Sequence, residues 1–202
     1  MVNELGIIPA LNEIMLKGNS AGGVLGMIGK GTKAVLTKDA MSMMEMLIDV
    51  EYKMFRDLNV KVFFLQNIFT DLLLGYNIKD VFEHFAEYVR KKYKVTPGFV
   101  TLNMPYLKGK LEEWGIEDVV ICSSINAAGF NMHPSKEEYE KVIAANDPTK
   151  YQLMAMNVLA SGSITVQQSF DYINSLNIQS VVFGASSKGH IKSTVEAIQL
   201  KS

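Results

Sequence analysis

Short apolar runs and amphipathic helical stripes alternate along most of this chain, and this alternation constrains the fold more than any other feature. Five runs are short and bounded by turn residues, as parallel strands covered on both faces are. They span residues 60–65, 99–103, 118–122, 153–157 and 180–183. A weaker sixth run spans residues 24–28. Strands that alternate with helices indicate βαβ units and a parallel sheet, so we expect an α/β fold.

The segments between these runs carry apolar residues at helical spacing. The stripes lie within residues 44–58, 78–89, 107–114, 139–143, 165–173 and 191–198. Pro105 and Pro134 each stand where the first turn of a helix is expected. Thr165 and Gln168 have the spacing of a capping box. Residues 1–20 also have a helical pattern, with no strand before them.

Two architectures fit this order of elements. The small-residue loops after the strands favour a TIM-barrel-like array of parallel strands, and a doubly wound parallel sheet is the alternative. A complete barrel needs eight strands and usually about 250 residues, whereas this chain has 202 residues. We therefore expect a barrel that lacks its first one or two strands. No segment has the composition of a flexible linker, so one β/α domain is expected over residues 1–202.

Composition narrows the classes of partner. A net charge of −1 gives no electrostatic reason to expect a nucleic acid or an acidic membrane. The most apolar stretch, residues 60–76, is interrupted by polar side chains and is too short to span a bilayer. The single cysteine, Cys122, excludes an internal disulfide framework, and the first residues lack a signal-peptide pattern. These features predict a cytoplasmic protein with a small-molecule ligand.

A candidate anion site lies after the last two strands. In barrels, the loops after the seventh and eighth strands and a helix N-terminus commonly bind phosphate. The glycines, hydroxyls and basic side chains of this site are Gly162, Gly184, Ser186, Ser187, Lys188 and His190. The alternative is that a serine only caps the last helix and that Lys188 is a solvated surface residue.

Amide side chains lie at or just after the ends of three strands, at Asn103, Asn126 and Asn157. Amides both donate and accept hydrogen bonds, so they suit a hydroxyl-rich or carbonyl ligand. Divalent metals prefer carboxylates and imidazoles, so no metal site is expected. The alternative is that each amide caps a turn by bonding to nearby backbone.

His133 and Asp71 are the candidate proton carriers. His133 precedes a proline in a loop that follows a strand, and imidazole titrates near neutral pH. Asp71 is the carboxylate that follows a strong strand most closely. The structural alternatives are a helix cap for His133 and a helix N-terminal carboxylate for Asp71. Cys122 lies inside a strand, so we expect a buried, unreactive thiol.

The segment Leu153–Gly162, followed by Ser180–Ile191 with its Gly-Ala-Ser-Ser-Lys-Gly-His run, resembles the last two β/α units of TIM-barrel proteins. It is most similar to the aldo-keto reductases. The resemblance covers the last quarter of the chain and implies a barrel fold. It also implies that residues 184–188 hold the adenosine phosphate of NADPH. The catalytic Asp, Tyr, Lys and His of that family have no matching set at the earlier strand ends.

These features predict an enzyme-type barrel that binds a phosphorylated or polyhydroxylated small molecule at the carboxyl ends of its strands, with no reaction assigned. Two alternatives stay open. One is an NADPH-dependent oxidoreductase of the aldo-keto reductase type. The other is a non-catalytic barrel subunit or scaffold that pairs with another chain, for example in a homo-oligomer.

Overall fold

A computed structural model describes residues 38–199 of the chain. Contacts divide the chain into two compact units, Met1–Val50 and Glu51–Ser202. The first described element is helix α3 (Lys38–Met54), and the whole sheet belongs to the second unit. The helix expected in residues 1–20 and the weak strand expected at residues 24–28 lie outside the described residues.

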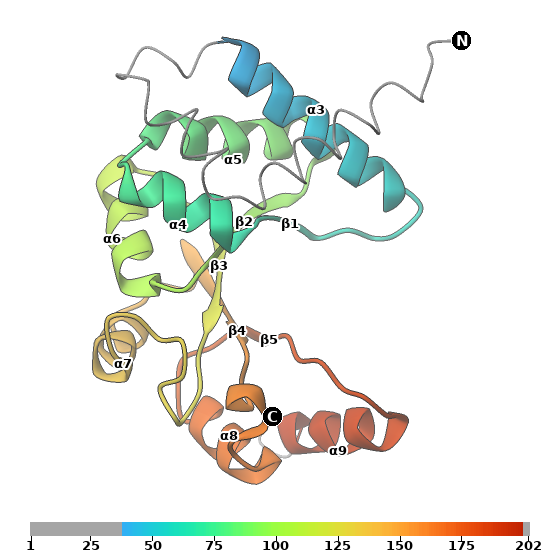
Figure 1. Cartoon of the computed structure of the whole chain (residues 1–202), viewed down its shortest axis with the longest axis vertical. Helices are drawn as coiled ribbons and strands as arrows, with labels where there is room; N and C mark the ends of the chain where they lie inside the picture. The colour runs from blue at the N-terminus through green and yellow to red at the C-terminus, as the bar shows by residue number, and fades with distance from the viewer. Residues whose placement is uncertain (1–37, 200–202) are drawn as a thin grey trace. The chain divides into compact units, whose positions relative to one another are not determined.

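The second unit is built on five parallel strands that follow one another in chain order (Figure 1). Their bounds are β1 (Val62–Leu65), β2 (Thr96–Thr101), β3 (Val119–Ser124), β4 (Tyr151–Met156) and β5 (Ser180–Val181). Each strand pairs in parallel with the strand before it. The expected α/β class with a parallel sheet is confirmed, and all five strong runs contain strand residues.

The described strands lack the reversal of order that the doubly wound alternative predicts. A doubly wound sheet grows in both directions from its first strands, so its strand order reverses at a switch point. The order β1-β2-β3-β4-β5 has no reversal among the described strands. Because crossovers between parallel strands are right-handed, a sequential order places the connecting helices on the same face of the sheet.

Helices connect the strands, most of them at the expected places. Their bounds are α4 (Asn67–Gly75), α5 (Lys79–Tyr93), α6 (Met104–Trp114), α7 (Lys136–Ala144), the 3₁₀ turn η1 (Ala160–Gly162), α8 (Val166–Ile173) and α9 (Lys188–Gln199). The capping box of Thr165 and Gln168 is confirmed, and Pro105 lies in the first turn of α6. Pro134 is a correction: it precedes the cap residue Ser135 of α7, so it lies outside that helix.

Aromatic side chains form the core between the sheet and the helices α5 and α6. Phe99 of β2 is fully buried and lies 5.3 Å from Phe82 and 5.5 Å from Phe85, measured between ring centroids. Phe82 also lies 5.2 Å from the ring of Trp114 on α6. Tilted ring pairs of this kind contribute about 0.5–1.5 kcal/mol each beyond their buried area. They hold the helices against one face of the sheet.

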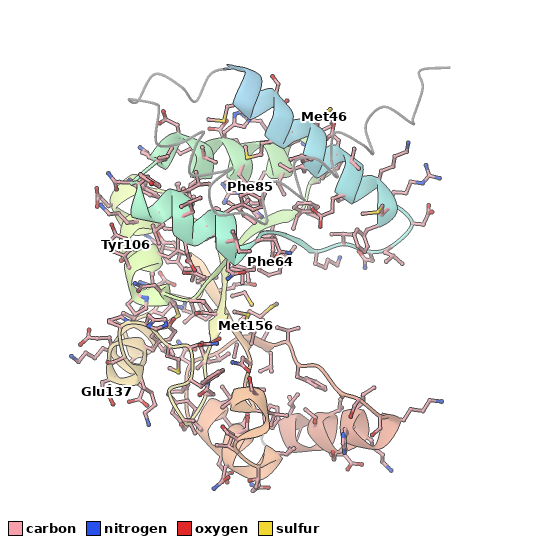
Figure 2. The ribbon with its side chains drawn as sticks, viewed as in Figure 1. Met46, Phe64, Phe85, Tyr106, Glu137 and Met156 are labelled. Carbon is pink, nitrogen blue, oxygen red and sulfur yellow. The ribbon has the colours of Figure 1, made fainter. Side chains whose placement is uncertain are left out.

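The opposite face of the sheet is apolar and less completely covered. Because partners in a parallel register point to the same side, Phe64, Gly98 and Val120 share this face, together with Cys122 and Met154. Phe64, labelled in Figure 2, is half-buried, and its ring lies over Gly98, where a Cβ atom would overlap it. A glycine is therefore required for the ring to lie close to the sheet.

No helix of the described part of the chain has both the length and the apolar composition needed to cross a bilayer.

Candidate functional site

The carboxyl ends of the five strands lie on one edge of the sheet because all the strands are parallel. The loops that follow them carry the residues singled out in the sequence. Polar groups at this edge belong to two kinds: a buried network at the ends of β2 and β3, and capped turns after β2, β3, β4 and β5.

Asp71 anchors helix α4 to the end of β2. Its carboxylate accepts a hydrogen bond of 2.5 Å from the hydroxyl of Thr101 and one of 3.1 Å from the backbone N–H of Leu102. The expected place of Asp71 at a helix N-terminus is correct only in part. It lies in the middle of the short helix α4, which the sequence patterns did not indicate, and it bonds to another element rather than to its own helix end.

Tyr139 is the centre of the buried network. Its hydroxyl donates to the carbonyl oxygen of Leu102 over 2.9 Å and accepts from the backbone N–H of Met104 over 3.1 Å. The hydroxyl of Ser123 lies 3.0 Å away and donates to the carbonyl of Thr101 over 2.7 Å. Burial raises the pKa of Tyr139, and the contact with the Ser123 hydroxyl opposes this shift. The network joins α7, β2 and β3 at the edge of the sheet.

The two candidate proton carriers meet at one peptide segment. The backbone N–H of His133 donates to the carbonyl oxygen of Leu102 over 3.1 Å, while Asp71 accepts from the N–H of the same residue. The His133 side chain is exposed. The structure therefore brings the loop after β3 and the helix after β1 to the end of β2. The imidazole of His133 is open to solvent, whereas the carboxylate of Asp71 is only partly exposed.

The three candidate amides all bond to nearby backbone. Asn103 accepts from the N–H of Tyr106 and caps helix α6. The fully buried Asn126 closes its own loop, because its Oδ1 accepts from the N–H of Phe130 and its Nδ2 donates to the carbonyl of Phe130, both over 2.9 Å. Asn157 accepts from the N–H of Ser161 over 3.1 Å. These are the contacts that the capping alternative predicts.

The candidate anion residues occupy the loops after two neighbouring strands. Gly162 ends η1 after β4 with φ 86°, and Gly184 follows β5. The hydroxyl of Ser187 accepts from the N–H of His190 over 3.2 Å at the start of α9, as a capping serine does. The hydroxyl of Ser186 lies 3.2 Å from Nδ1 of His190. Lys188, Ser186 and Ser187 are exposed.

Cys122 is a buried, inert thiol, as expected. Burial raises its pKa to about 11, and the side chain is 4% exposed. Within residues 38–199, no group of three or more histidine, cysteine or acidic side chains has the geometry to hold a metal ion. The expected absence of a metal site remains a prediction for the chain as a whole.

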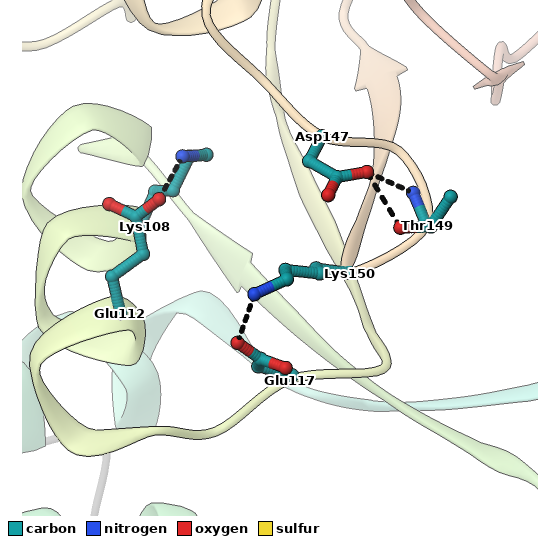
Figure 3. Close-up of polar contacts among 6 residues, drawn as sticks. All are labelled: Lys108, Glu112, Glu117, Asp147, Thr149 and Lys150. Carbon is teal, nitrogen blue, oxygen red and sulfur yellow. Dashed lines mark hydrogen bonds and ion pairs between the residues drawn. The ribbon is translucent and has the colours of Figure 1, made fainter.

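A second polar cluster, which sequence reasoning missed, lies near the amino ends of β3 and β4 (Figure 3). Lys108 is buried, lies with its Nζ atom 5.1 Å from the ring of Tyr151 and pairs with Glu112 over 2.5 Å. Lys150 pairs with Glu117 over 2.8 Å. Ligand sites of parallel α/β sheets lie at the carboxyl ends of the strands, so this cluster lies away from the candidate site. The spacing of Lys108 and Glu112, four residues apart, was the available sequence signal.

The described residues also form an open hollow of about 260 Å³ between α8, β5 and the end of α9. Its lining includes Ile173, Leu176, Val181 and Ile198, so it lies at the start of β5 rather than at the carboxyl edge. It is therefore separate from the candidate site.

No family model, curated protein or solved structure matches this chain. The similarity to aldo-keto reductases therefore stays a resemblance of one segment, and the functional argument depends on the residues themselves.

Proposed function

We propose that this chain is a TIM-barrel-like protein of enzyme type that binds a phosphorylated or polyhydroxylated small molecule at the carboxyl edge of its sheet. The observation that carries the proposal is the sequential order of five parallel strands. In β/α barrels, strands follow one another in this order, and ligands bind where the strand carboxyl ends meet.

The less covered face of the sheet supports the barrel arrangement. An all-parallel sheet is normally covered on both faces, and in a barrel the second face is the interior. Val100 and Met154 on this face are only half-buried in the described structure. Further strands, from this chain or from another subunit, would bury them.

The loops after β4 and β5 are the proposed anion site. These strands are hydrogen-bonded neighbours, so Gly162 and the start of α9 follow adjacent strand ends. The first turn of α9 has outward N–H groups and the positive end of the helix dipole. Lys188 and His190 add basic side chains, and the hydroxyl of Ser186 adds a donor.

The remaining predicted residues have more limited roles in this proposal. Asn126 is fully buried and uses both of its amide groups on the backbone of Phe130. Asn103 and Asn157 each use Oδ1 on local backbone, so their Nδ2 groups are the amides proposed to contact the neutral part of a ligand. Asp71 already accepts two hydrogen bonds, whereas the imidazole of His133 is exposed. We therefore favour His133 over Asp71 as the proton carrier.

A thermal-shift panel of inorganic phosphate, several sugar phosphates and NADPH tests the proposal. A ligand that binds the native state raises Tm by mass action. We expect a sugar phosphate to raise Tm and Lys188→Ala to weaken its binding by about tenfold, or about 1.4 kcal/mol. Lys141→Ala is the matched control, because Lys141 is also an exposed helix lysine and belongs to a different helix, α7.

The other outcomes identify the alternatives. Selective stabilisation by NADPH would favour the oxidoreductase of aldo-keto reductase type. No shift with any ligand would contradict the anion site and leave the non-catalytic barrel subunit as the better explanation.

A further inference from the structure

The loop after β3 presents an exposed aromatic ring at the carboxyl edge of the sheet. Phe130 is 44% exposed, although the loop that carries it begins and ends in buried side chains. Asn126 is fully buried, and Met132 is 4% exposed. The loop therefore has an interior of its own, and the ring of Phe130 is not part of it.

Hydrogen bonds fix the backbone that carries this ring. The side chain of Asn126 binds the backbone of Phe130 twice, because its Oδ1 accepts from the N–H and its Nδ2 donates to the carbonyl, each over 2.9 Å. The residues on either side of Phe130 have left-handed backbone, with φ 71° at Gly129 and 56° at Asn131. Both polar groups of a buried amide therefore hold one exposed phenylalanine in place.

The position of the ring separates Phe130 from a scattered exposed apolar residue, which needs no explanation. Binding residues are often carried by loops that a rigid scaffold positions, and this loop follows a strand at its carboxyl end. The three residues before Phe130 are Ala127, Ala128 and Gly129. None of them has a side chain large enough to cover the ring.

The loop of Phe130 follows the strand next to those of the proposed anion site. Where this loop leaves β3, the N–H of Ile125 donates to the carbonyl oxygen of Met156 at the end of β4 over 3.1 Å. The loop with Gly162 follows β4, and α9 follows β5. Neighbouring strands are about 4.8 Å apart, so three successive strand ends span about 10 Å. A sugar phosphate has a similar length.

A phenyl ring suits the C–H face of a cyclic sugar. The face of the phenyl ring is electron-rich, so it attracts the polarised C–H groups on the flat side of a sugar ring. Stacking also removes the apolar surface of both rings from water. The sugar hydroxyls stay at the edge of the stack, where they can accept from an amide such as Nδ2 of Asn157. Inorganic phosphate and acyclic polyols have no such face.

We propose that Phe130 is the residue on which the neutral part of the ligand stacks, and that this ligand is a cyclic sugar phosphate. The proposal rests on the function proposed above, because the loops after β4 and β5 hold the phosphate. It narrows the ligand from any phosphorylated or polyhydroxylated molecule to one with a saturated sugar ring. Because Asn126 fixes the backbone of Phe130 before the ligand binds, less entropy is lost on binding.

NMR titrations of the full chain with inorganic phosphate, glycerol 3-phosphate and glucose 6-phosphate test the proposal. We expect glucose 6-phosphate to bind about tenfold more tightly than the other two. Phe130→Ala should remove this advantage and leave the affinity for inorganic phosphate unchanged, because the phosphate does not touch the ring. If Phe130→Ala leaves the affinity for glucose 6-phosphate unchanged, the stacking role is wrong and the anion site stands. If none of the three phosphates binds, the anion site is wrong and the stacking proposal falls with it.

Phe55→Ala is the matched control. Phe55 is also 44% exposed, but it lies in the turn between α3 and β1, which leads to the amino end of a strand. This variant should bind all three phosphates as the unaltered chain does. Equal losses of affinity for glucose 6-phosphate in Phe55→Ala and Phe130→Ala would overturn the proposal.

Phe130→Trp tests the stacking while keeping an aromatic ring. Its affinity for glucose 6-phosphate should be retained, and its indole fluorescence should change with glucose 6-phosphate but not with inorganic phosphate. The native Trp114 is 8% exposed, so the added indole is the one that reports a ligand at this edge. Equal fluorescence changes with both phosphates would overturn the proposal. Tighter binding of adenosine monophosphate than of ribose 5-phosphate would show that Phe130 stacks on a base, and it would overturn the assignment of a sugar ring.

Discussion

The carboxylate of Asp71 on α4 accepts a 2.5 Å hydrogen bond from the hydroxyl of Thr101 at the end of β2. A second hydrogen bond, from the N–H of Leu102, occupies the other carboxylate oxygen. One side chain therefore joins the helix after β1 to the end of the neighbouring strand through two hydrogen bonds, at the edge where a ligand site is proposed.

Asp71→Ala should lower the free energy of unfolding by about 1–3 kcal/mol, because it leaves two partly buried donors without an acceptor. Urea unfolding measures the change. Asp57→Ala is the control, since the Asp57 side chain is 90% exposed, and it should change stability by less than about 0.5 kcal/mol. Equal effects of the two substitutions would contradict the anchoring role.

Tyr139→Phe should lower stability by a similar amount, about 1–3 kcal/mol, because the lost hydroxyl serves Ser123 and the backbone of Leu102 and Met104. The ring itself is retained, so no large cavity forms. Tyr76→Phe is the matched control, because Tyr76 is exposed. Thermal unfolding that shows no difference between the two variants would mean that the network is not stabilising.

Gly98→Ala should lower the free energy of unfolding, whereas Gly109→Ala should raise it. A Cβ at Gly98 would overlap the ring of Phe64, and overpacking of this kind costs about 1–3 kcal/mol. Gly109 lies inside α6 with open space around it, so alanine should stabilise the helix by about 0.5–1 kcal/mol. The overlapping atoms are Cδ1 and Cε1 of Phe64, so Phe64→Ala should relieve much of the cost in a double variant with Gly98→Ala. Additive costs would show that the ring is not responsible.

The buried thiol of Cys122 should make stability fall at alkaline pH. Burial raises its pKa from 9.0 to about 11, so the folded chain holds the proton more tightly than the unfolded chain. Its contribution is complete below pH 9.0 and is lost as pH rises through about 11, a change of roughly 2–3 kcal/mol.

The comparison of unaltered protein with Cys122→Ala isolates this contribution, because every tyrosine titrates in both. Urea unfolding from pH 7 to pH 11 should show a smaller loss of stability in the variant. Parallel pH profiles would contradict the prediction.

The strands were predictable because their apolar runs are local. The runs at residues 118–122 and 153–157 contain most of β3 and β4, with bounds displaced by one or two residues. Helix α4 was not predictable in this way. Most of its residues are apolar, and they are not confined to one face. The sequence therefore lacks the two-faced pattern that distinguishes a surface helix from a buried strand.

The sequence by itself determined the α/β class, the strand positions and the main caps, because periodicity and capping act between residues close in the chain. It also determined which polar residues follow the strands. Only the tertiary structure decided that β1 to β5 pair in chain order, without the reversal typical of a doubly wound sheet. It alone showed that Asp71 and His133 both bond to Leu102, while Asn126 closes its own loop. Such contacts join residues far apart in the sequence, and their geometry depends on strand register and helix packing, which no local pattern encodes.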